Sequence, residues 1–442
     1  MENYFIAQLE NQLFPCSCGK THSVRTKKII VGKGILARIP EVLTELNLGK
    51  KILLVFDENT YRAAGKYVEE TLQGEHFETI ACPLSPKPDW PYLEPDEEAR
   101  STIGSYLYYE PNLLMAIGSG VITDLTKFVA HRLSIPFVAV ATAPSMDGYS
   151  SPGTPMLVGG YKVTYDATPP QVIFADLDVL TRAPLPLIHA GLADLVGKIT
   201  SNADWAMRTM LWQESFCQPI WEDTKTRLMT LDQEAEKLSQ RDEKSIFDLS
   251  LASLYSGMGM DMVGDSRPAS GAEHLVAHYL EIMALHRGIH PSLHGLRVGG
   301  ATVVVSKMYH RFLEEVNDLA RRTWILLSHE KFETIKMHFG PLFPFAQEVV
   351  LKKQKLTPCP LEVLKTEQFR EAIEDKLSSL PSPSRTLSRA LAPQSLEELG
   401  FPPSLIREAF LYARFLRERL TLLDLLDALG VLEEYLDWAL SE

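Results

Sequence analysis

The first part of the chain, up to about residue 180, alternates short apolar runs with amphipathic stretches, and this alternation most constrains the fold. Each run is rich in β-branched or large apolar residues and is bounded by Gly, Pro, Asp or Ser, as buried strands are. Runs that are apolar on both faces and separated by helices indicate parallel strands in an α/β layer. The predicted strands are residues 28–31, 51–56, 77–82, 113–117, 136–140 and 171–175, with a hairpin at 155–165 around Gly159-Gly160.

From about residue 185 the strand signal fades and apolar residues recur at helical spacing. The predicted helices are residues 188–206, 245–260, 272–285, 301–315 and 403–429, after the earlier helices at 60–72 and 123–133. Proline-containing segments at 341–344 and 381–393 predict loops. The sequence therefore predicts a mostly parallel, Rossmann-like α/β domain over residues 1–183, followed by an all-helical domain over 184–442.

Charge and composition exclude several classes of protein. The 44 Lys and Arg against 57 Asp and Glu give a net charge of −13, and no basic stripe is present to neutralise phosphates. Nucleic acid is therefore not an expected partner. No apolar run reaches the ~18 residues of a membrane span, and the first residues lack the features of a signal peptide. Five scattered cysteines suit a reducing compartment, so we expect a cytoplasmic protein.

A glycine turn follows the strand predicted at 113–117. Gly118, Ser119 and Gly120 lead into a helix, where backbone N–H groups and the helix dipole favour a diphosphate. The third glycine of a dinucleotide fingerprint is replaced by Thr123. An ordinary tight turn explains this motif equally well.

Two more polar positions follow predicted strands. Asp57 ends the run 51–56, where a carboxylate can accept hydrogen bonds from a ribose and favour NAD over NADP. The alternative, which is somewhat favoured, is that Asp57 caps the helix that follows it. The loop 141–148 carries hydroxyl groups and Asp147, at the strand end where open α/β sheets bind ligands.

Metal-ligating residue types gather further along the chain. Asp194 lies near the start of the first predicted helix of the helical part, and His294 begins another helix. His274 and His278 are four residues apart, so both project from one helix face. A carboxylate with two imidazoles leaves a coordination position open, which is typical of a catalytic metal. Spacing alone does not decide between His274 and His278, and each residue alone has an ordinary structural explanation.

A second cluster lies near the N-terminus. Cys16, Cys18 and His22 fit a metal-binding turn, but structural zinc takes four ligands and only three are present. The sequence therefore favours a turn without metal.

Six segments together resemble the glycerol-1-phosphate dehydrogenases, and most closely their bacterial branch. This family belongs to the superfamily of dehydroquinate synthase, glycerol dehydrogenase and the iron-containing alcohol dehydrogenases. The resemblance runs in order over about residues 16–300. Its segments are IGSGVITDLTKFVA, ATAPSMDGYSSP, PMLVGGYKVTY, GLADLVGKITSNADW, SRPASGAEHLVAH and LHGLRVGG.

The resemblance implies a role for each matching position. A divalent metal would be held by Asp194, His274 and His294, with Asp194 also touching substrate. Asp147 would contact substrate, and His278 would face it without binding metal. The cofactor diphosphate or nicotinamide would lie near Gly118, Ser119, Gly120, Val121, Ile122, Asp124, Lys127, Thr142, Ser145 and Ser151. One departure concerns Leu296, where many relatives carry a glutamate that could support metal binding.

The implied reaction is the reversible reduction of dihydroxyacetone phosphate to sn-glycerol 1-phosphate by NADH or NADPH. One divalent metal per chain would polarise the carbonyl, with zinc favoured over nickel, iron or manganese. His278 would relay a proton to the alkoxide. Lys162 and Arg267 are candidates for gripping the substrate phosphate, although surface or structural roles suit both better.

Three alternatives stay open from the sequence. Glycerol dehydrogenase and dehydroquinate synthase use the same scaffold, and fold analogy does not separate them. A non-catalytic NAD-binding protein is the third, which the intact set of metal-ligand types argues against. Apolar helices in the second half are compatible with a homodimer.

Overall fold

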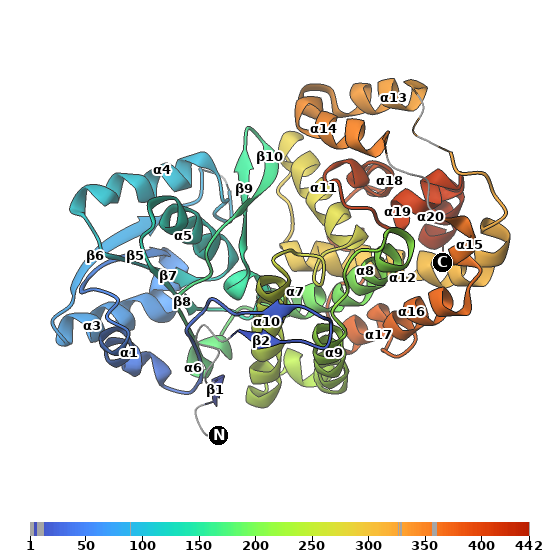
Figure 1. Cartoon of the computed structure of the whole chain (residues 1–442). Coiled ribbons are helices and arrows are strands. Elements are labelled where there is room, and N and C mark those ends of the chain that lie inside the picture. Colours follow the sequence, from blue (N-terminus) through green and yellow to red (C-terminus); the bar gives the residue numbers. More distant parts are fainter. Residues whose placement is uncertain are drawn as a thin grey trace. The chain divides into compact units, whose positions relative to one another are not determined.

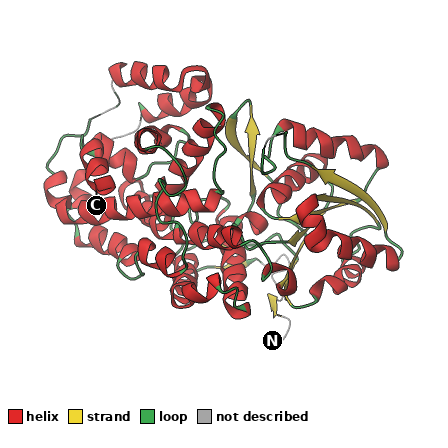
Figure 2. Cartoon of the chain, turned by 180° about the vertical axis from the view of Figure 1, so that it is seen from behind, coloured by secondary structure: helices red, strands yellow, loops and turns green. Residues whose placement is uncertain are grey.

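The computed structural model describes residues 4–6, 13–88, 90–325, 327, 329–355 and 360–441. The chain divides into two compact units, Met1–Leu195 with Gln233–Ser266, and Val196–Asp232 with Arg267–Glu442. All described strands belong to the first unit, whereas the described part of the second unit is helical (Figure 1, Figure 2). None of the described helices is long and apolar enough to cross a membrane.

The first unit is built on a seven-stranded sheet in the order β1-β4-β11-β8-β7-β5-β6. Six of these strands are parallel, and β1 pairs antiparallel with β4 at one edge. The α/β prediction is confirmed. The strands are β1 (Tyr4–Ile6), β4 (Lys28–Gly32), β5 (Lys51–Asp57), β6 (Glu78–Leu84), β7 (Leu113–Gly118), β8 (Phe137–Ala141) and β11 (Val172–Asp176).

Buried residues on both faces explain why these strands are parallel and central. Every residue of β7, β8 and β11 is buried, and helices cover such two-sided strands. In Figure 1, α1 (Ile39–Glu45) and α3 (Lys66–Gly74) lie on one face, and α4 (Glu97–Ser105) and α5 (Gly120–Leu133) on the other. The connection from β5 to β6 and the connection from β7 to β8 run in opposite directions across the sheet. Because both crossovers are right-handed, their helices lie on opposite faces.

Two small hairpins accompany the main sheet. The predicted hairpin is β9 (Gly153–Val158) with β10 (Tyr161–Asp166), and both turn glycines have positive φ. Near the N-terminus β2 (Phe14–Pro15) pairs with β3 (Thr21–His22). This second hairpin falls below the usual strand length, so it needs other contacts for stability.

The compact units differ from the division at residue 183 that the sequence predicts. Helix α10 (Glu243–Val263) packs with the first unit, where the Ser150 hydroxyl donates to the Leu254 carbonyl at 2.7 Å. Further helices of this unit are α2 (Glu58–Thr60), α6 (Leu177–Leu180) and α7 (Leu185–Val196), and the last residue of α7 already belongs to the second unit.

The second unit packs helices around buried apolar faces. Its helices are α8 (Lys198–Trp212), α11 (Ala272–His286), α12 (His294–Leu319), α13 (His329–Phe339), α14 (Phe343–Lys353), α15 (Leu361–Leu364), α16 (Glu367–Leu377), α17 (Pro383–Arg389), α18 (Pro403–Tyr412), α19 (Leu422–Ala428) and α20 (Leu432–Ser441). Helix α9 (Gln218–Ser239) runs through the boundary at Asp232.

Several predicted boundaries were wrong. The helix expected at 188–206 is two helices that meet at Gly197, and that expected at 403–429 breaks between α18 and α19. The segment 381–393, predicted as a loop, contains α17, because Pro383 occupies the first helical position and Ser382 caps it. Segment 341–344 holds a 3₁₀ turn and the start of α14.

Candidate functional site

The predicted glycine turn lies at the carboxyl end of β7. Gly118 ends the strand and Ser119 precedes α5, and the Ser119 side chain accepts no capping hydrogen bond from the N–H groups of this helix. The Thr142 amide and the Tyr149 hydroxyl both donate to the Gly118 carbonyl at 3.2 Å, which fixes the turn. The first-turn N–H groups of α5 and its dipole suit a diphosphate there.

Asp57 lies on the same edge of the sheet, one strand away. The register pairs Val55 of β5 with Ala116 of β7, so Asp57 ends its strand level with the glycine turn. The direction of strand succession reverses between β5 and β7, and open α/β sheets bind ligands at such a switch point. Asp57 also forms a capping box with Thr60, which confirms the helix-cap interpretation. Its contact with a ribose stays a prediction.

Asp124 and Lys127 meet beneath the loop after β8. The buried Lys127 ammonium donates to the carbonyls of Gly148 at 2.7 Å and Gly153 at 3.1 Å, and lies 3.7 Å from the Asp124 carboxylate. Burial lowers the pKa of Lys127 and raises that of Asp124 to about 6, with their mutual attraction opposing both shifts. Lys127 therefore orders the loop that carries Ser151, and direct cofactor contact by this pair stays a prediction.

The remaining predicted residues of this unit gather around the same loop. Thr142, Ser145 and Ser151 are buried, and the Ser151 hydroxyl donates to the carbonyls of Gly148 and Gly153. The Asp147 amide donates to the Asp194 carboxylate at 3.1 Å, and the Ser256 hydroxyl donates to the Asp147 carboxylate at 2.8 Å.

Asp194 itself lies where the chain leaves the first unit. It occupies the last turn of α7, not the start of a helix as predicted, because α7 begins at Leu185 and stops at Val196. Only 1% of the residue is exposed. The hydrogen bond from the Asp147 amide and this burial fix the carboxylate in place.

Two glycines let helices approach this loop. A Cβ on Gly191 of α7 would lie 1.7 Å from the Pro144 carbonyl oxygen, and one on Gly257 of α10 would lie 2.5 Å from the Asp147 carbonyl oxygen. Backbone atoms cannot swing away as a flexible side chain can. The absence of a side chain at these two glycines therefore leaves room for the loop residues at their observed places.

Gly191→Ala should lower the free energy of unfolding by about 1–3 kcal/mol or more, since the added methyl overpacks a backbone contact. Thermal unfolding of the purified chain measures this. The matched control is Gly104→Ala in α4, where the added Cβ meets no atom within 4 Å and alanine should stabilise by up to ~1 kcal/mol. Equal stability of the two variants would contradict the close packing of α7 on the loop.

The three predicted histidines of the second unit form one cluster. His274 and His278 lie one turn apart on α11, and His294 is the first residue of α12. The His294 ring centroid lies 5.4 Å from that of His274 and 5.2 Å from that of His278. The fold therefore brings together three imidazoles that two different helices contribute.

Glu273 distinguishes His274 from His278, and sequence reasoning missed it. The fully buried Glu273 carboxylate lies 2.8 Å from Nδ1 of His274 and accepts from the Thr200 hydroxyl and the Gly271 amide. Although burial acts to raise it, the pKa of Glu273 is lowered by these hydrogen bonds. A charged carboxylate only accepts, so Nδ1 of His274 carries the proton and Nε2 keeps its lone pair for a metal.

A buried ion pair joins the two helices that carry the histidines. Arg297, one turn into α12, lies 2.5 Å from the Glu281 carboxylate of α11 and donates to the Ala277 carbonyl at 3.1 Å. It also donates to the Ser292 carbonyl just before His294. These bonds fix His294 against α11. Two signals in the sequence could have pointed to these residues. Glu273 directly precedes the candidate ligand His274, and Arg297 follows the candidate ligand His294 by one helical turn.

The predicted phosphate ligands lie in different units. Lys162 is on β10, where its charge lowers the pKa of Asp124 against the larger effect of burial. Arg267 pairs with Glu214 at 3.3 Å. Binding of phosphate by either residue stays a prediction.

The chain is similar to several known proteins. The family model described as iron-containing alcohol dehydrogenase matches residues 30–184. The glycerol-1-phosphate dehydrogenase [NAD(P)+] of Halalkalibacterium halodurans is 32% identical over 422 residues, which cover 95% of this chain and 97% of that protein. The enzyme of the same name from Bacillus licheniformis is 29% identical, covering 97% and 96%.

Solved structures show the same fold at lower identity. An archaeal halo-thermophilic alcohol dehydrogenase from a Red Sea brine pool aligns with a TM-score of 0.62 at 14% identity, covering 95% of this chain and 98% of that one. A probable glycerol dehydrogenase from Sinorhizobium meliloti gives 0.60 at 14% identity, covering 94% and 98%.

Proposed function

Because the chain belongs to the glycerol-1-phosphate dehydrogenase family, we propose that it interconverts dihydroxyacetone phosphate and sn-glycerol 1-phosphate with NAD(P)H. Family membership over nearly the whole chain is the observation that carries this proposal. The histidine cluster of the second unit and the glycine turn of the first supply the two binding functions that such a reaction needs.

The proposed metal ligands are Asp194, His274 and His294, which form one set of candidate ligand residues. The chemistry of this set fits a divalent ion, because the Glu273–His274 bond presents Nε2 and Asp194 is a buried carboxylate. One carboxylate with two neutral imidazoles suits Zn²⁺, and nickel or iron are the alternatives. When bound, the ion would polarise the substrate carbonyl while the nicotinamide carries the hydride.

The protein's own side chains would bind and orient the substrate. Asp147, held by Ser256, would accept a substrate hydroxyl, and His278 would exchange the proton at the C2 oxygen. Lys162 and Arg267 would neutralise the phosphate. The turn at 118–122 would hold the cofactor diphosphate, with Asp57 at the adenine ribose and the loop carrying Thr142, Ser145 and Ser151 at the nicotinamide.

A paired-substrate assay tests the proposed function. Oxidation of NADH should be fast with dihydroxyacetone phosphate and at least about 100-fold slower with dihydroxyacetone, because the cationic groups proposed to bind the phosphate would then lack a partner. Chiral analysis of the product should give sn-glycerol 1-phosphate. A preference for unphosphorylated dihydroxyacetone would favour a glycerol dehydrogenase instead, and tight NAD binding without turnover would favour a non-catalytic protein.

Glu273→Gln should weaken metal binding about 10- to 100-fold, since the neutral amide no longer holds His274 in the ligand tautomer by charge. Competition with a chelator measures the dissociation constant. Glu371→Gln, on the exposed face of α16, makes the same change away from the histidines and should leave affinity unaltered. Equal affinity in both variants would remove Glu273 from the proposed site.

Asp57→Asn should raise the ratio of kcat/KM for NADPH to that for NADH by about tenfold, roughly 1.4 kcal/mol. Asparagine still caps the helix, but it no longer repels a 2′-phosphate or accepts as strongly from a 2′-hydroxyl. Asp96→Asn is the control, because Asp96 also caps a helix by accepting from a backbone amide. An unchanged ratio in Asp57→Asn would mean that Asp57 caps the helix and does not contact the cofactor.

A further inference from the structure

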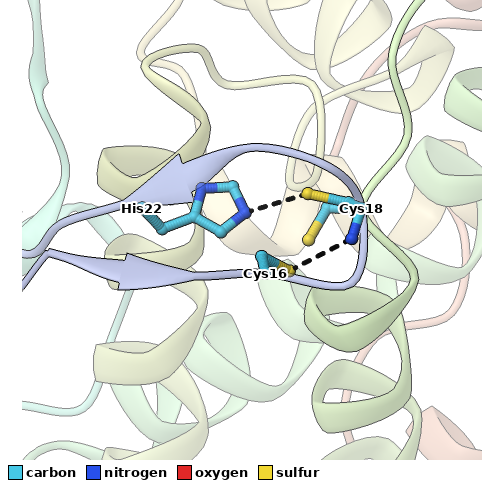
Figure 3. A group of neighbouring side chains, drawn as sticks. Cys16, Cys18 and His22 are labelled. Atoms are coloured by element: carbon cyan, nitrogen blue, oxygen red, sulfur yellow. Dashed lines mark hydrogen bonds between the residues drawn. The ribbon is translucent and has the colours of Figure 1, made fainter.

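A second cluster of metal-ligand types lies in the N-terminal hairpin β2–β3. The turn between its strands is tight, because the Cys16 amide donates to the Lys20 carbonyl and the Gly19 amide to the Cys16 carbonyl, both at 2.9 Å. Gly19 has a φ of 84°, in the left-handed region that glycine adopts readily. Cys16, Cys18 and His22 turn toward one another at the closed end (Figure 3).

The distances within the cluster resemble those around a bound ion. The Cys18 sulfur lies 3.3 Å from Nε2 of His22, and two such ligands on one tetrahedral zinc would be roughly 3.6 Å apart. The Cys18 amide points at the Cys16 sulfur at 3.5 Å, a contact that stabilises a thiolate. The four described cysteines, Cys16, Cys18, Cys82 and Cys217, form no disulfide.

His22 is held in the tautomer that a metal ligand requires. Its Nδ1 lies 2.9 Å from the Met262 carbonyl oxygen, which only accepts, so Nδ1 carries the proton and Nε2 directs its lone pair toward Cys18. The residue is 2% exposed. The Arg25 amide and Nε donate to the Asp261 carboxylate at 2.9 Å and 2.7 Å. These bonds hold the segment after the hairpin at the same end of α10.

Cys217 is the ligand that the local sequence lacks. It is buried directly before α9, and its thiol belongs to the same set of candidate ligand residues as Cys16, Cys18 and His22. Three thiolates with one imidazole make a closed set, as in structural zinc sites, and leave no position for a substrate. The prediction of a turn without metal rested on there being only three ligands.

We propose that Cys16, Cys18, His22 and Cys217 bind one structural Zn²⁺, separate from the metal of the dehydrogenase reaction. The ion fixes a hairpin whose strands are only two residues long, which is too short to be stable by strand pairing alone.

X-ray absorption at the zinc edge of the purified chain tests this without any substitution. Sulfur neighbours at about 2.3 Å are expected, in a proportion that matches one Cys₃His site. A spectrum with nitrogen and oxygen neighbours only would overturn the proposal, whether or not the enzyme reduces its substrate.

Metal counting on three variants assigns the ligands. Cys18→Ser and Cys217→Ser should each contain one zinc per chain less than the wild type, and both should unfold at lower temperature. Cys82→Ser replaces a buried cysteine of β6 outside the cluster and should keep the wild-type zinc content. Wild-type zinc content in Cys18→Ser would overturn the site. Wild-type zinc content in Cys217→Ser would show that Cys217 is not the fourth ligand.

Discussion

His274→Ala is expected to lose the catalytic metal and to reduce dihydroxyacetone phosphate at least about 10³-fold more slowly than the wild type. Polarisation of a carbonyl by a bound ion is worth several kcal/mol, and each ~1.4 kcal/mol corresponds to a factor of ten in rate. The substitution removes one of only three proposed protein ligands. It also leaves Glu273 buried without the imidazole to which it is bonded at 2.8 Å.

Elemental analysis together with the NADH assay measures this effect. His286→Ala is the matched control, since it makes the same change on the exposed end of the same helix. We expect that control to keep the wild-type metal content and rate. Metal content in His274→Ala equal to that of the control would contradict the assignment of His274 as a ligand.

His278→Ala is expected to keep the metal and to lower kcat by about 10²- to 10³-fold, the usual contribution of a positioned acid–base group. His278 lies one turn along α11 from His274, and its ring centroid is 5.2 Å from that of His294. The proposed role needs the imidazole at the substrate oxygen and not on the ion. Binding of NADH, followed by its fluorescence, should therefore be unchanged in this variant.

The two variants also separate the competing assignments of the histidine pair. Metal loss in His278→Ala, with full metal content in His274→Ala, would exchange the two roles. Loss of metal in both variants would instead make His278 a further ligand, and the proton would need another donor.

The strands could be predicted from the sequence because a buried strand is recognisable locally, as a short run of apolar residues. The runs at 113–117 and 136–140 correspond to β7 and β8, in which every residue is buried. Helix ends were harder to predict. Apolar spacing continues through Gly197, so the local pattern does not mark the break between α7 and α8.

The same distinction between predictable and unpredictable features applies to the candidate site. Residue types such as Asp194 and the three histidines could be recognised from the sequence, but their partners could not. Glu281 and Arg297 lie on different helices and meet only because α12 packs on α11. The role of Asp57 as a cap could be predicted, because its partner Thr60 is only three residues further along the chain, whereas the proposed contribution of Cys217 joins positions that are far apart in the sequence.

The most direct test of the central claim is an anomalous-scattering map from crystals of the metal-loaded enzyme, recorded at the absorption edge of the metal found by elemental analysis. The account predicts a peak coordinated by the Asp194 carboxylate, Nε2 of His274 and the His294 imidazole. A fully occupied peak that lacks any of these three ligands, or none near them in an active enzyme, would contradict it.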